Sequence, residues 1–274
     1  MPPTPLRYLR GRLEARGRGP GTPYRRLESL RFLVTRDRRA ALAFLRRRFP
    51  TVGPRAKLRL LVRFVTITNQ VRAYHTQAEL LEVATALLER GGDRGLVVVE
   101  AGAGKGASTA KLSLALRAAG GGTLHVFDSF RGIPDNQEVH RHHDGREIRF
   151  RKGAFTGRLG AVRRVVERFG APELCVFHKG WFEETLPGFE APVDVALLDV
   201  DLWSSTRTCL VHLMPRLRPD GVLFSQDGHL ATITARLAEP GFWRDEVGCP
   251  PPRMEGLGAA KLLRIRPGGR ADAR

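Results

Sequence analysis

Acidic side chains follow two apolar runs in the second half of the chain, where they could bind a metal ion or move a proton. Asp199 and Asp201 come directly after the run 193–198, and Asp227 follows the run 222–224. If both runs are parallel strands, their carboxyl ends meet at one edge of a sheet, which brings these carboxylates together. Carboxylate oxygens suit a hard divalent cation, and a carboxylate can also act as a general base.

A glycine-rich loop follows an earlier apolar run and is typical of nucleoside cofactor sites. The segment VVVEAGAGKGAST, residues 97–109, carries Glu100 and then Gly102 and Gly104. A phosphate-binding P-loop needs Ser or Thr directly after its lysine, and here a glycine follows, so that motif is excluded. The dinucleotide fingerprint fits in register with Ala107 as its third small residue. S-adenosylmethionine fits as well, with Glu100 facing its ammonium group.

The next apolar run, 124–127, ends at Asp128, whose carboxylate could bind the ribose hydroxyls of either cofactor. Asp128 therefore does not separate NAD from S-adenosylmethionine. A short-chain dehydrogenase would need a tyrosine with a lysine four residues later, and none of Tyr8, Tyr24 and Tyr74 has that partner. S-adenosylmethionine is the favoured cofactor, and an NAD-binding oxidoreductase is the alternative.

The elements that must position these residues alternate between strands and helices. We expect strands at 96–99, 124–127, 174–177, 193–198 and 222–224. We expect helices at 108–119 and 159–169, preceded by a helix that starts at the capping box formed by Thr76 and Glu79 and continues to about Arg90. This pattern predicts an α/β fold with a doubly wound, mostly parallel sheet, of the Rossmann-like class.

Two basic amphipathic helices, 24–49 and 55–68, are expected ahead of that fold. We divide the chain into a basic N-terminal helical extension at 1–72, a cofactor-binding domain at 73–266 and a loose tail at 267–274. Residues 1–22 are rich in Pro, Gly and Arg and are expected to be loose.

The formal net charge is +18, and a basic surface of this size would attract nucleic acid or anionic lipid. Its arginines are spread along the whole chain, whereas a nucleic-acid footprint is clustered. We therefore expect no specific nucleic-acid partner, although RNA methylation is kept as an alternative. Binding of the N-terminal helices to an anionic membrane surface is a further option.

No apolar run reaches the length of a membrane span, and the first residues lack the pattern of a secretory signal. The three cysteines, Cys175, Cys209 and Cys249, have spacings that suit neither zinc nor a disulfide framework. A cytoplasmic protein is expected, and the sequence leaves its oligomeric state open, a homo-oligomer included.

Three linked motifs carry a family resemblance. FDSFRGIPD (127–135), KGWFEETLP (179–187) and LLDVDLWSSTRTCLVHLMPRLRPDGVLFSQDG (197–228) resemble the macrocin O-methyltransferase family in matching order. Its members are class I S-adenosylmethionine-dependent enzymes that methylate sugar hydroxyls of natural products. The similarity covers about residues 76–230.

The resemblance implies roles for the residues that match. Asp199 and Asp227 would bind Mg²⁺, and Asp201 would be the general base. The family has a pair of aspartates where this chain has Gln226 and Asp227, so one anionic ligand is replaced by a neutral amide that can still coordinate through its oxygen. Cofactor contacts are expected from these residues: Glu100, Gly102, Gly104, Asp128, Ser129, Gly180 and Trp181.

The implied activity is O-methylation of a small hydroxylated acceptor, with the metal ion assisting. A protein that binds the cofactor without catalysis is the remaining alternative. His140, His142 and His143 are expected to lie on a charged loop or lid that no strand or helix fixes, where one of them could act as base. His229 is an outside candidate for the same role.

Overall fold

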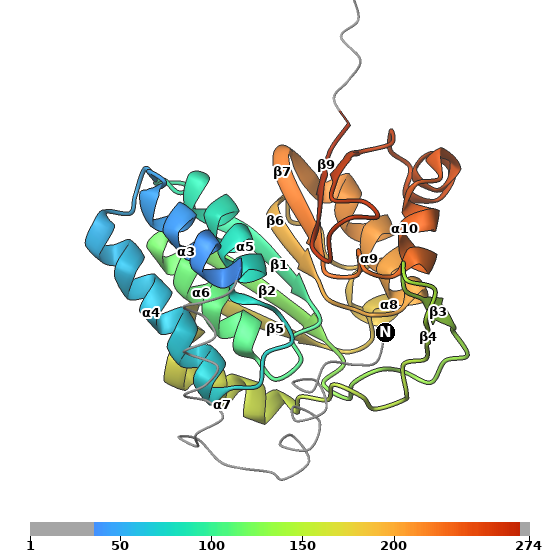
Figure 1. Ribbon diagram of the computed structural model, residues 1–274, viewed down its shortest axis with the longest axis horizontal. Coiled ribbons are helices and arrows are strands. Elements are labelled where there is room, and N and C mark those ends of the chain that lie inside the picture. The colour runs from blue at the N-terminus through green and yellow to red at the C-terminus, as the bar shows by residue number, and fades with distance from the viewer. Residues whose placement is uncertain (1–35, 269–274) are drawn as a thin grey trace, which may run out of the picture.

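The computed structural model describes residues 36–268, which form a twisted sheet with helices on both faces (Figure 1). The strand order is β5-β2-β1-β6-β7-β9-β8. The strands are β1 (Leu96–Ala101), β2 (Gly122–Asp128), β5 (Cys175–Lys179), β6 (Val193–Leu198), β7 (Leu217–Ser225), β8 (Arg253–Glu255) and β9 (Leu263–Arg266). The first five in the spatial order are parallel, and β9 runs antiparallel to both β7 and β8.

All five predicted strands are present, and the predicted fold class is confirmed. These strands are runs of Val, Leu and Ala because a parallel sheet is covered on both faces and both faces must be apolar. Successive side chains point to opposite faces, so Val98 joins one core and Val99 the other.

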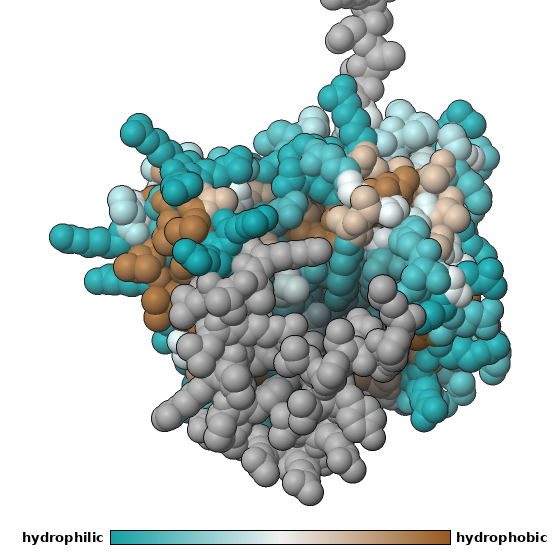
Figure 2. Space-filling view, in the orientation of Figure 1, coloured by the Kyte–Doolittle hydropathy of each residue, from teal (hydrophilic) through white to brown (hydrophobic). Residues whose placement is uncertain are grey.

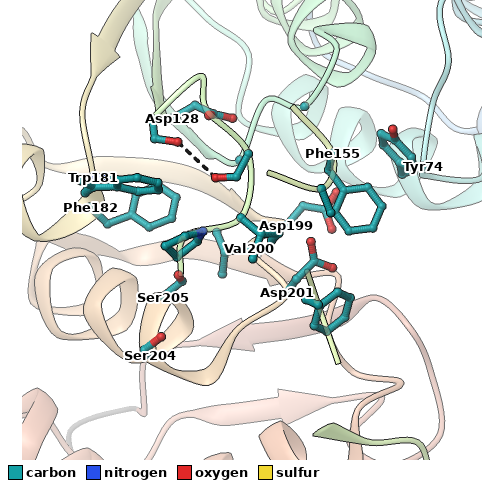
Figure 3. A pocket seen from close by; sticks show the side chains of 18 of the residues that line it. Tyr74, Asp128, Phe155, Trp181, Phe182, Asp199, Val200, Asp201, Ser204 and Ser205 are labelled. Atoms are coloured by element: carbon teal, nitrogen blue, oxygen red, sulfur yellow. Dashed lines mark hydrogen bonds between the residues drawn. The ribbon is translucent and has the colours of Figure 1, made fainter. Parts of the chain in front are cut away.

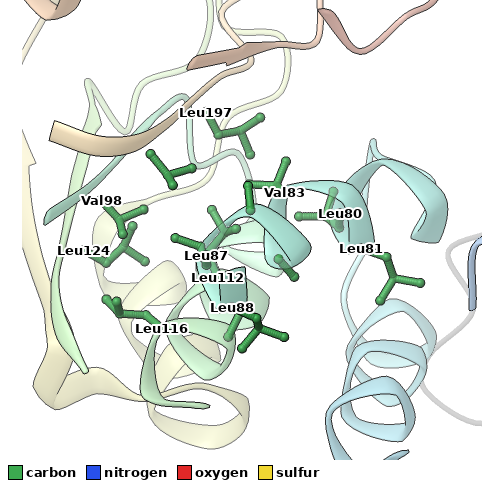
Figure 4. Packing of buried hydrophobic residues seen from close by; sticks show 14 of the residues in the cluster. Leu80, Leu81, Val83, Leu87, Leu88, Val98, Leu112, Leu116, Leu124 and Leu197 are labelled. Atoms are coloured by element: carbon green, nitrogen blue, oxygen red, sulfur yellow. The ribbon is translucent and has the colours of Figure 1, made fainter. Parts of the chain in front are cut away.

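Five helices cover the first face. They are α3 (Arg36–Arg46), α4 (Pro54–Gln70), α5 (Gln77–Glu89), α6 (Ala107–Ala118) and α7 (Leu159–Phe169). Figure 4 shows the leucines of α5 and α6 packed against Val98, Leu124 and Leu197 of the sheet. The predicted capping box starts α5, since the Glu79 N–H donates to Thr76 Oγ1 at 3.2 Å and the Thr76 N–H to Glu79 Oε2 at 2.8 Å.

The opposite face is covered by α8 (Phe182–Thr185), α9 (Trp203–Leu213) and α10 (Ala231–Leu237). Two short 3₁₀ helices, η1 (Pro172–Leu174) and η2 (Met214–Arg216), precede β5 and β7, and a π-helix, η3 (Phe242–Val247), follows α10. Trp243 of η3 is almost fully buried in this second core.

The two basic N-terminal helices pack on α5 and α6, on the outer side of the first layer of helices. Within the described residues the expected helix 24–49 spans only Arg36–Arg46, and the second runs from Pro54 to Gln70. Phe44 and Phe64 insert into the same core as α5 and α6, while the division of the chain at residue 72 stays a prediction. The expectations for residues 1–22, for 24–35 and for most of the tail lie outside the described residues.

The outer side of these helices combines apolar and cationic side chains. Leu42, Leu58 and Val62 are exposed, and Figure 2 shows apolar surface over α4 bordered by hydrophilic side chains. Binding of this side to an anionic surface stays a prediction. No helix among the described residues is both long and apolar enough to cross a bilayer.

The segment 134–153 contains a short hairpin, β3 (His140–Arg141) and β4 (Glu147–Ile148). Our expectation that no strand fixes its histidines is wrong for His140, which is buried in β3. The hairpin was not predicted from the sequence because each of its strands has only two residues, which is too short for a periodic pattern. The apolar residues of the hairpin make their contacts with distant segments.

Candidate functional site

A cavity of about 550 Å³ opens at the carboxyl ends of β1, β2, β5 and β6. Its lining includes eight of the residues expected from the sequence: Gly102, Gly104, Asp128, Ser129, Gly180, Trp181, Asp199 and Asp201. In Figure 3, Asp128 and Trp181 lie on one side of the cavity, and Asp199 and Asp201 lie between them and Phe155. The parallel arrangement therefore gathers these eight residues at one cavity, whereas Glu100, Gln226 and Asp227 are buried and do not line it.

The glycine loop brings backbone, rather than side chains, to the floor of the cavity. Gly102 has φ +88°, and a Cβ atom there would lie 2.1 Å from the carbonyl oxygen of Asp199. Only glycine fits such a contact in the left-handed region. The loop after β1 and the loop after β6 are thus in direct backbone contact.

Asp128 ends β2 beside this loop. Its Oδ2 accepts the Ala103 N–H at 2.8 Å, and its Oδ1 accepts the Phe130 N–H at 2.6 Å. Burial raises the pKa of Asp128 although these bonds oppose the shift. Each carboxylate oxygen can accept a second hydrogen bond, so the group remains suited to a ribose diol.

Glu100 takes a different position from the expected one. Its side chain is fully buried, and its Oε2 accepts the Thr109 hydroxyl at 2.6 Å. Burial raises its pKa to about 7. Since Glu100 does not line the cavity, this geometry does not support direct contact with a cofactor ammonium; the side chain instead ties β1 to α6.

Ser129, Gly180 and Trp181 line the cavity after β2 and β5. The Ser129 hydroxyl accepts the Arg131 N–H at 3.1 Å and is mostly buried. The Arg131 guanidinium lies 5.6 Å from the centre of the Trp181 ring, which holds that ring at the edge of the cavity.

Three carboxylates meet beside the glycine loop. Atoms of Asp199, Asp201 and Asp227 all lie within 4.8 Å of one another, and no other cluster of metal-ligating acids, histidines or cysteines occurs in residues 36–268. Asp201 has φ +61°, an uncommon conformation for a residue with a side chain, which indicates strain held by its surroundings.

The electrostatics of this cluster are those of carboxylates crowded in a buried place. Burial and the charge of Asp199 raise the pKa of Asp227 to about 7. Burial, then Asp199 and Asp227, raise the pKa of Asp201 well above its usual value. Burial alone would raise the pKa of Asp199, but His75, whose Nε2 lies 3.1 Å from Asp199 Oδ2, outweighs it and the net shift is downward.

The oxygen atoms of these three carboxylates are suitable ligands for a divalent cation. Neither oxygen of the fully buried Asp227 carboxylate makes a hydrogen bond of normal geometry, and the buried amide of Gln226 is also unpaired. Unpaired buried polar atoms are costly, and a cation would satisfy the Asp227 oxygens while relieving the repulsion among the three carboxylates. Oxygen-only ligands of this kind suit Mg²⁺.

The histidines of the hairpin do not line this cavity. His140 Nε2 lies 3.2 Å from Glu138 Oε2, and His143 Nε2 lies 3.1 Å from the Gly228 carbonyl oxygen. His229 does line the cavity, and burial lowers its pKa to about 4. The geometry thus leaves His229 as the only member of the predicted histidine group at the cavity.

Sequence reasoning named none of the individual residues that hold and complete the cavity wall, although segment 134–153 and the chain after Leu230 are where the sequence led us to expect substrate contacts. Glu138 accepts the N–H groups of Trp203 and Ser204, so the hairpin segment caps α9. Phe150, Phe155 and Lys261 line the cavity. They lie outside the strand ends, and no spacing in the sequence connects them.

Comparisons with known proteins agree with this arrangement. Residues 99–228 match a family model described as a methyltransferase domain. A protein of Streptomyces olivaceus, named 8-demethyl-8-(2,3-dimethoxy-alpha-L-rhamnosyl)-tetracenomycin-C 4'-O-methyltransferase, is 38% identical over 138 residues, 47% of this chain and 52% of the relative. The chain therefore spans about half the length of this curated relative.

Two solved structures share the fold. The O-methyltransferase NovP superposes with a TM-score of 0.62 at 20% identity, covering 77% of this chain and 99% of that one. The calicheamicin methyltransferase CalS11 superposes with a TM-score of 0.54 at 18% identity, covering 81% and 96%. The comparisons confirm the fold class and support a natural-product O-methyltransferase; the closer likeness to macrocin enzymes stays a prediction.

Proposed function

We propose that this chain is an S-adenosylmethionine-dependent O-methyltransferase that acts on a hydroxyl of a small natural product. The observation that carries the proposal is that a nucleoside-type glycine loop lines the same cavity as Asp199 and Asp201, whose carboxylates lie within 4.8 Å of the buried Asp227 carboxylate. The methyltransferase domain match covers both features.

The cofactor would occupy the side of the cavity formed by the loops after β1, β2 and β5. Gly102 and Gly104 admit it close to the backbone, and Asp128 would accept hydrogen bonds from its ribose. Ser129, Gly180 and Trp181 would border its base. The cofactor supplies an activated methyl group, so the protein must mainly orient the acceptor and take up a proton.

Asp199, Asp227 and Gln226 would hold a Mg²⁺ ion. A bound divalent cation lowers the cost of deprotonating an alcohol. Asp201, the third carboxylate of the cluster, would accept the proton of the acceptor hydroxyl. Burial and the neighbouring carboxylates raise the pKa of Asp201, which makes its carboxylate a stronger proton acceptor.

The acceptor is a hydroxylated small molecule, and the name of the Streptomyces relative makes a rhamnosyl group the first to test. The full chain is incubated with S-adenosylmethionine, Mg²⁺ and rhamnosides, and release of S-adenosylhomocysteine is measured with and without EDTA. Turnover lost in EDTA and restored by Mg²⁺ is expected. Turnover indifferent to both would refute the metal role but not methyl transfer.

The alternatives give different results. An NAD-binding oxidoreductase would bind nicotinamide coenzymes in calorimetry and would not bind S-adenosylhomocysteine. An RNA methyltransferase would transfer the methyl group of S-adenosylmethionine to RNA rather than to small hydroxylated acceptors. A protein that only binds the cofactor would bind S-adenosylhomocysteine and show no turnover. Cytoplasmic location and a homo-oligomeric state stay predictions.

A further inference from the structure

Lys261 brings a positive charge into a cavity lined mainly by neutral and acidic side chains. Among the described residues it is the only lysine of the lining, and no arginine lines the cavity. Its backbone is fixed, because its carbonyl oxygen accepts the Gly228 N–H at 2.9 Å. Its ammonium group donates to the Tyr74 carbonyl oxygen at 3.2 Å. An ammonium group has three hydrogens, so this bond leaves two of them for other partners.

The nearby carboxylates do not consume this charge. Asp199 Oδ2 lies 3.1 Å from His75 Nε2, and Asp135 of the lining pairs with Lys152 at 3.0 Å. Within residues 36–268 neither carboxylate forms an ion pair with Lys261. The ammonium group of Lys261 is therefore available to an anionic group of a ligand.

Lys261 lies at one end of the cavity. The Tyr74 ring rests on the glycine loop, since a Cβ atom on Gly104 would be 3.7 Å from it. Figure 3 shows Tyr74 and Trp181 on opposite sides of Asp199. Because Lys261 is bonded to the Tyr74 carbonyl oxygen, its ammonium group belongs to the end of the cavity that is remote from Trp181.

The proposed cofactor extends in two directions from its sulfur, with adenosine on one side and a tail that ends in an ammonium group and a carboxylate on the other. With adenosine at Asp128 and Trp181, and the sulfur beside the clustered carboxylates, the tail runs toward Tyr74. From this juxtaposition we infer that Lys261 binds the carboxylate of the cofactor tail. The inference rests on the proposed function and names a residue outside the matched segment 99–228.

Other cations are poorer partners for this carboxylate. Arg72 and Lys105 line a separate hollow beside the glycine loop, whose volume of about 10 Å³ is close to that of one water molecule. A carboxylate with its carbon chain needs more room, which the main cavity of about 550 Å³ provides. The Mg²⁺ ion proposed for the carboxylate cluster is the remaining alternative, and the test therefore removes it.

The test compares two nucleosides that differ only in this carboxylate. Calorimetry on the full chain in EDTA gives Kd for S-adenosylhomocysteine and for its decarboxylated analogue, which keeps the amine. We expect Kd to be at least about tenfold lower for S-adenosylhomocysteine, a difference of about 1.4 kcal/mol. Equal affinities, or a preference for the analogue, overturn the inference. Failure to bind either nucleoside refutes the proposed function instead.

Two variants separate the charge of Lys261 from its contact with Tyr74. Lys261→Gln keeps an N–H donor for the Tyr74 carbonyl oxygen and removes the charge. Kd for S-adenosylhomocysteine should rise about tenfold while Kd for the decarboxylated analogue stays within about threefold, so that the preference is lost. Lys261→Arg keeps the charge and should retain the preference. Equal weakening of both nucleosides in Lys261→Gln would show that the lysine only holds Tyr74 in place, and overturns the inference.

Arg72→Met and Lys105→Met are the matched controls, since each removes a positive charge beside the glycine loop. Both should retain the preference for S-adenosylhomocysteine. A preference that is lost in either control and kept in Lys261→Gln assigns the carboxylate to the other cation and overturns the inference.

Discussion

The backbone of Gly102 touches the carbonyl oxygen of Asp199, so that no side-chain atom fits between the glycine loop and the carboxylate loop. This contact fixes the cofactor side of the cavity relative to the proposed metal and base. A substitution that shifts the backbone of either loop should therefore also shift the other loop.

Gly102→Ala is expected to weaken S-adenosylhomocysteine binding and to lower the free energy of unfolding. Its Cβ would lie 2.1 Å from Asp199 oxygen, and its φ of +88° is unfavourable for alanine. Gly121→Ala is the matched control, since Gly121 has φ +95° but nothing within 4 Å of the added atom. Calorimetry and denaturant unfolding should show a clearly larger effect at position 102; equal effects would mean that the close contact is unimportant.

Glu138→Ala is expected to lower the free energy of unfolding by about 1–2 kcal/mol, because α9 loses its N-terminal hydrogen bonds. Burial would raise the pKa of Glu138, but bonds from His140, Ser204 and Trp203 outweigh it and bring the pKa to about 2. A lowered acid pKa stabilises the fold above the ordinary value of 4.5, so the effect of the substitution should shrink as the pH falls from 4.5 toward 2.

Glu147→Ala provides the control for this measurement. Glu147 pairs with Arg141 in the same hairpin but is 58% exposed, and exposed pairs contribute little. Urea unfolding curves of both variants check the difference, and an equal loss in both would show that capping of α9 is not the cause.

Lys111 should make stability depend on pH at neutral to alkaline values. It is buried in α6, where its Nζ donates to Thr68 Oγ1 at 2.7 Å and Gln77 Oε1 at 3.1 Å. Burial lowers its pKa from 10.5 to about 7. Because the unfolded chain then binds more protons between these values, stability should fall as the pH is lowered from about 10 to 7, by up to about 1.4 kcal/mol per unit.

Replacing the lysine isolates this contribution. Lys111→Met should flatten the dependence of the free energy of unfolding on pH between 7 and 10, as measured by denaturant titration of the metal-free protein. Lys152→Met, at a 70% exposed side chain, should leave the wild-type slope in place. A wild-type slope retained in Lys111→Met would contradict the assignment.

Asp201→Asn should reduce kcat by about 100-fold or more while leaving S-adenosylhomocysteine affinity within about threefold, since a general base is lost and the cofactor side is untouched. Asp199→Asn should also lower kcat and, unlike Asp201→Asn, should weaken the binding of Mg²⁺ that calorimetry measures. Asp220→Asn, at an exposed position of β7, should affect neither. Full activity in Asp201→Asn would remove it from the role of base.

Much of the fold could be predicted because buried parallel strands appear in the sequence as short runs of Val and Leu. The position of the cavity could be predicted from the same runs, since Asp128, Asp199 and Asp201 follow them directly. The antiparallel strands β8 and β9 were not predicted, because they have only three and four residues, too few for the alternation of Leu263, Arg264, Ile265 and Arg266 to stand out.

The orientation of Glu100 could not be read from the sequence. It sits at the end of β1, where one residue of register decides whether a side chain enters the cavity or the core. That Tyr74, Phe150 and Phe155 line the same cavity was not predictable either, because they come from distant or irregular segments that only tertiary folding brings together.

The central claim is tested most directly by a crystal structure of the full chain soaked with S-adenosylhomocysteine and Mn²⁺, the latter as an anomalous marker for the Mg²⁺ site. The account predicts the nucleoside between Gly102, Asp128 and Trp181, and an anomalous peak in contact with Asp199 and Asp227. A nucleoside bound elsewhere, or a loaded cofactor site with no ion at these carboxylates, would contradict it.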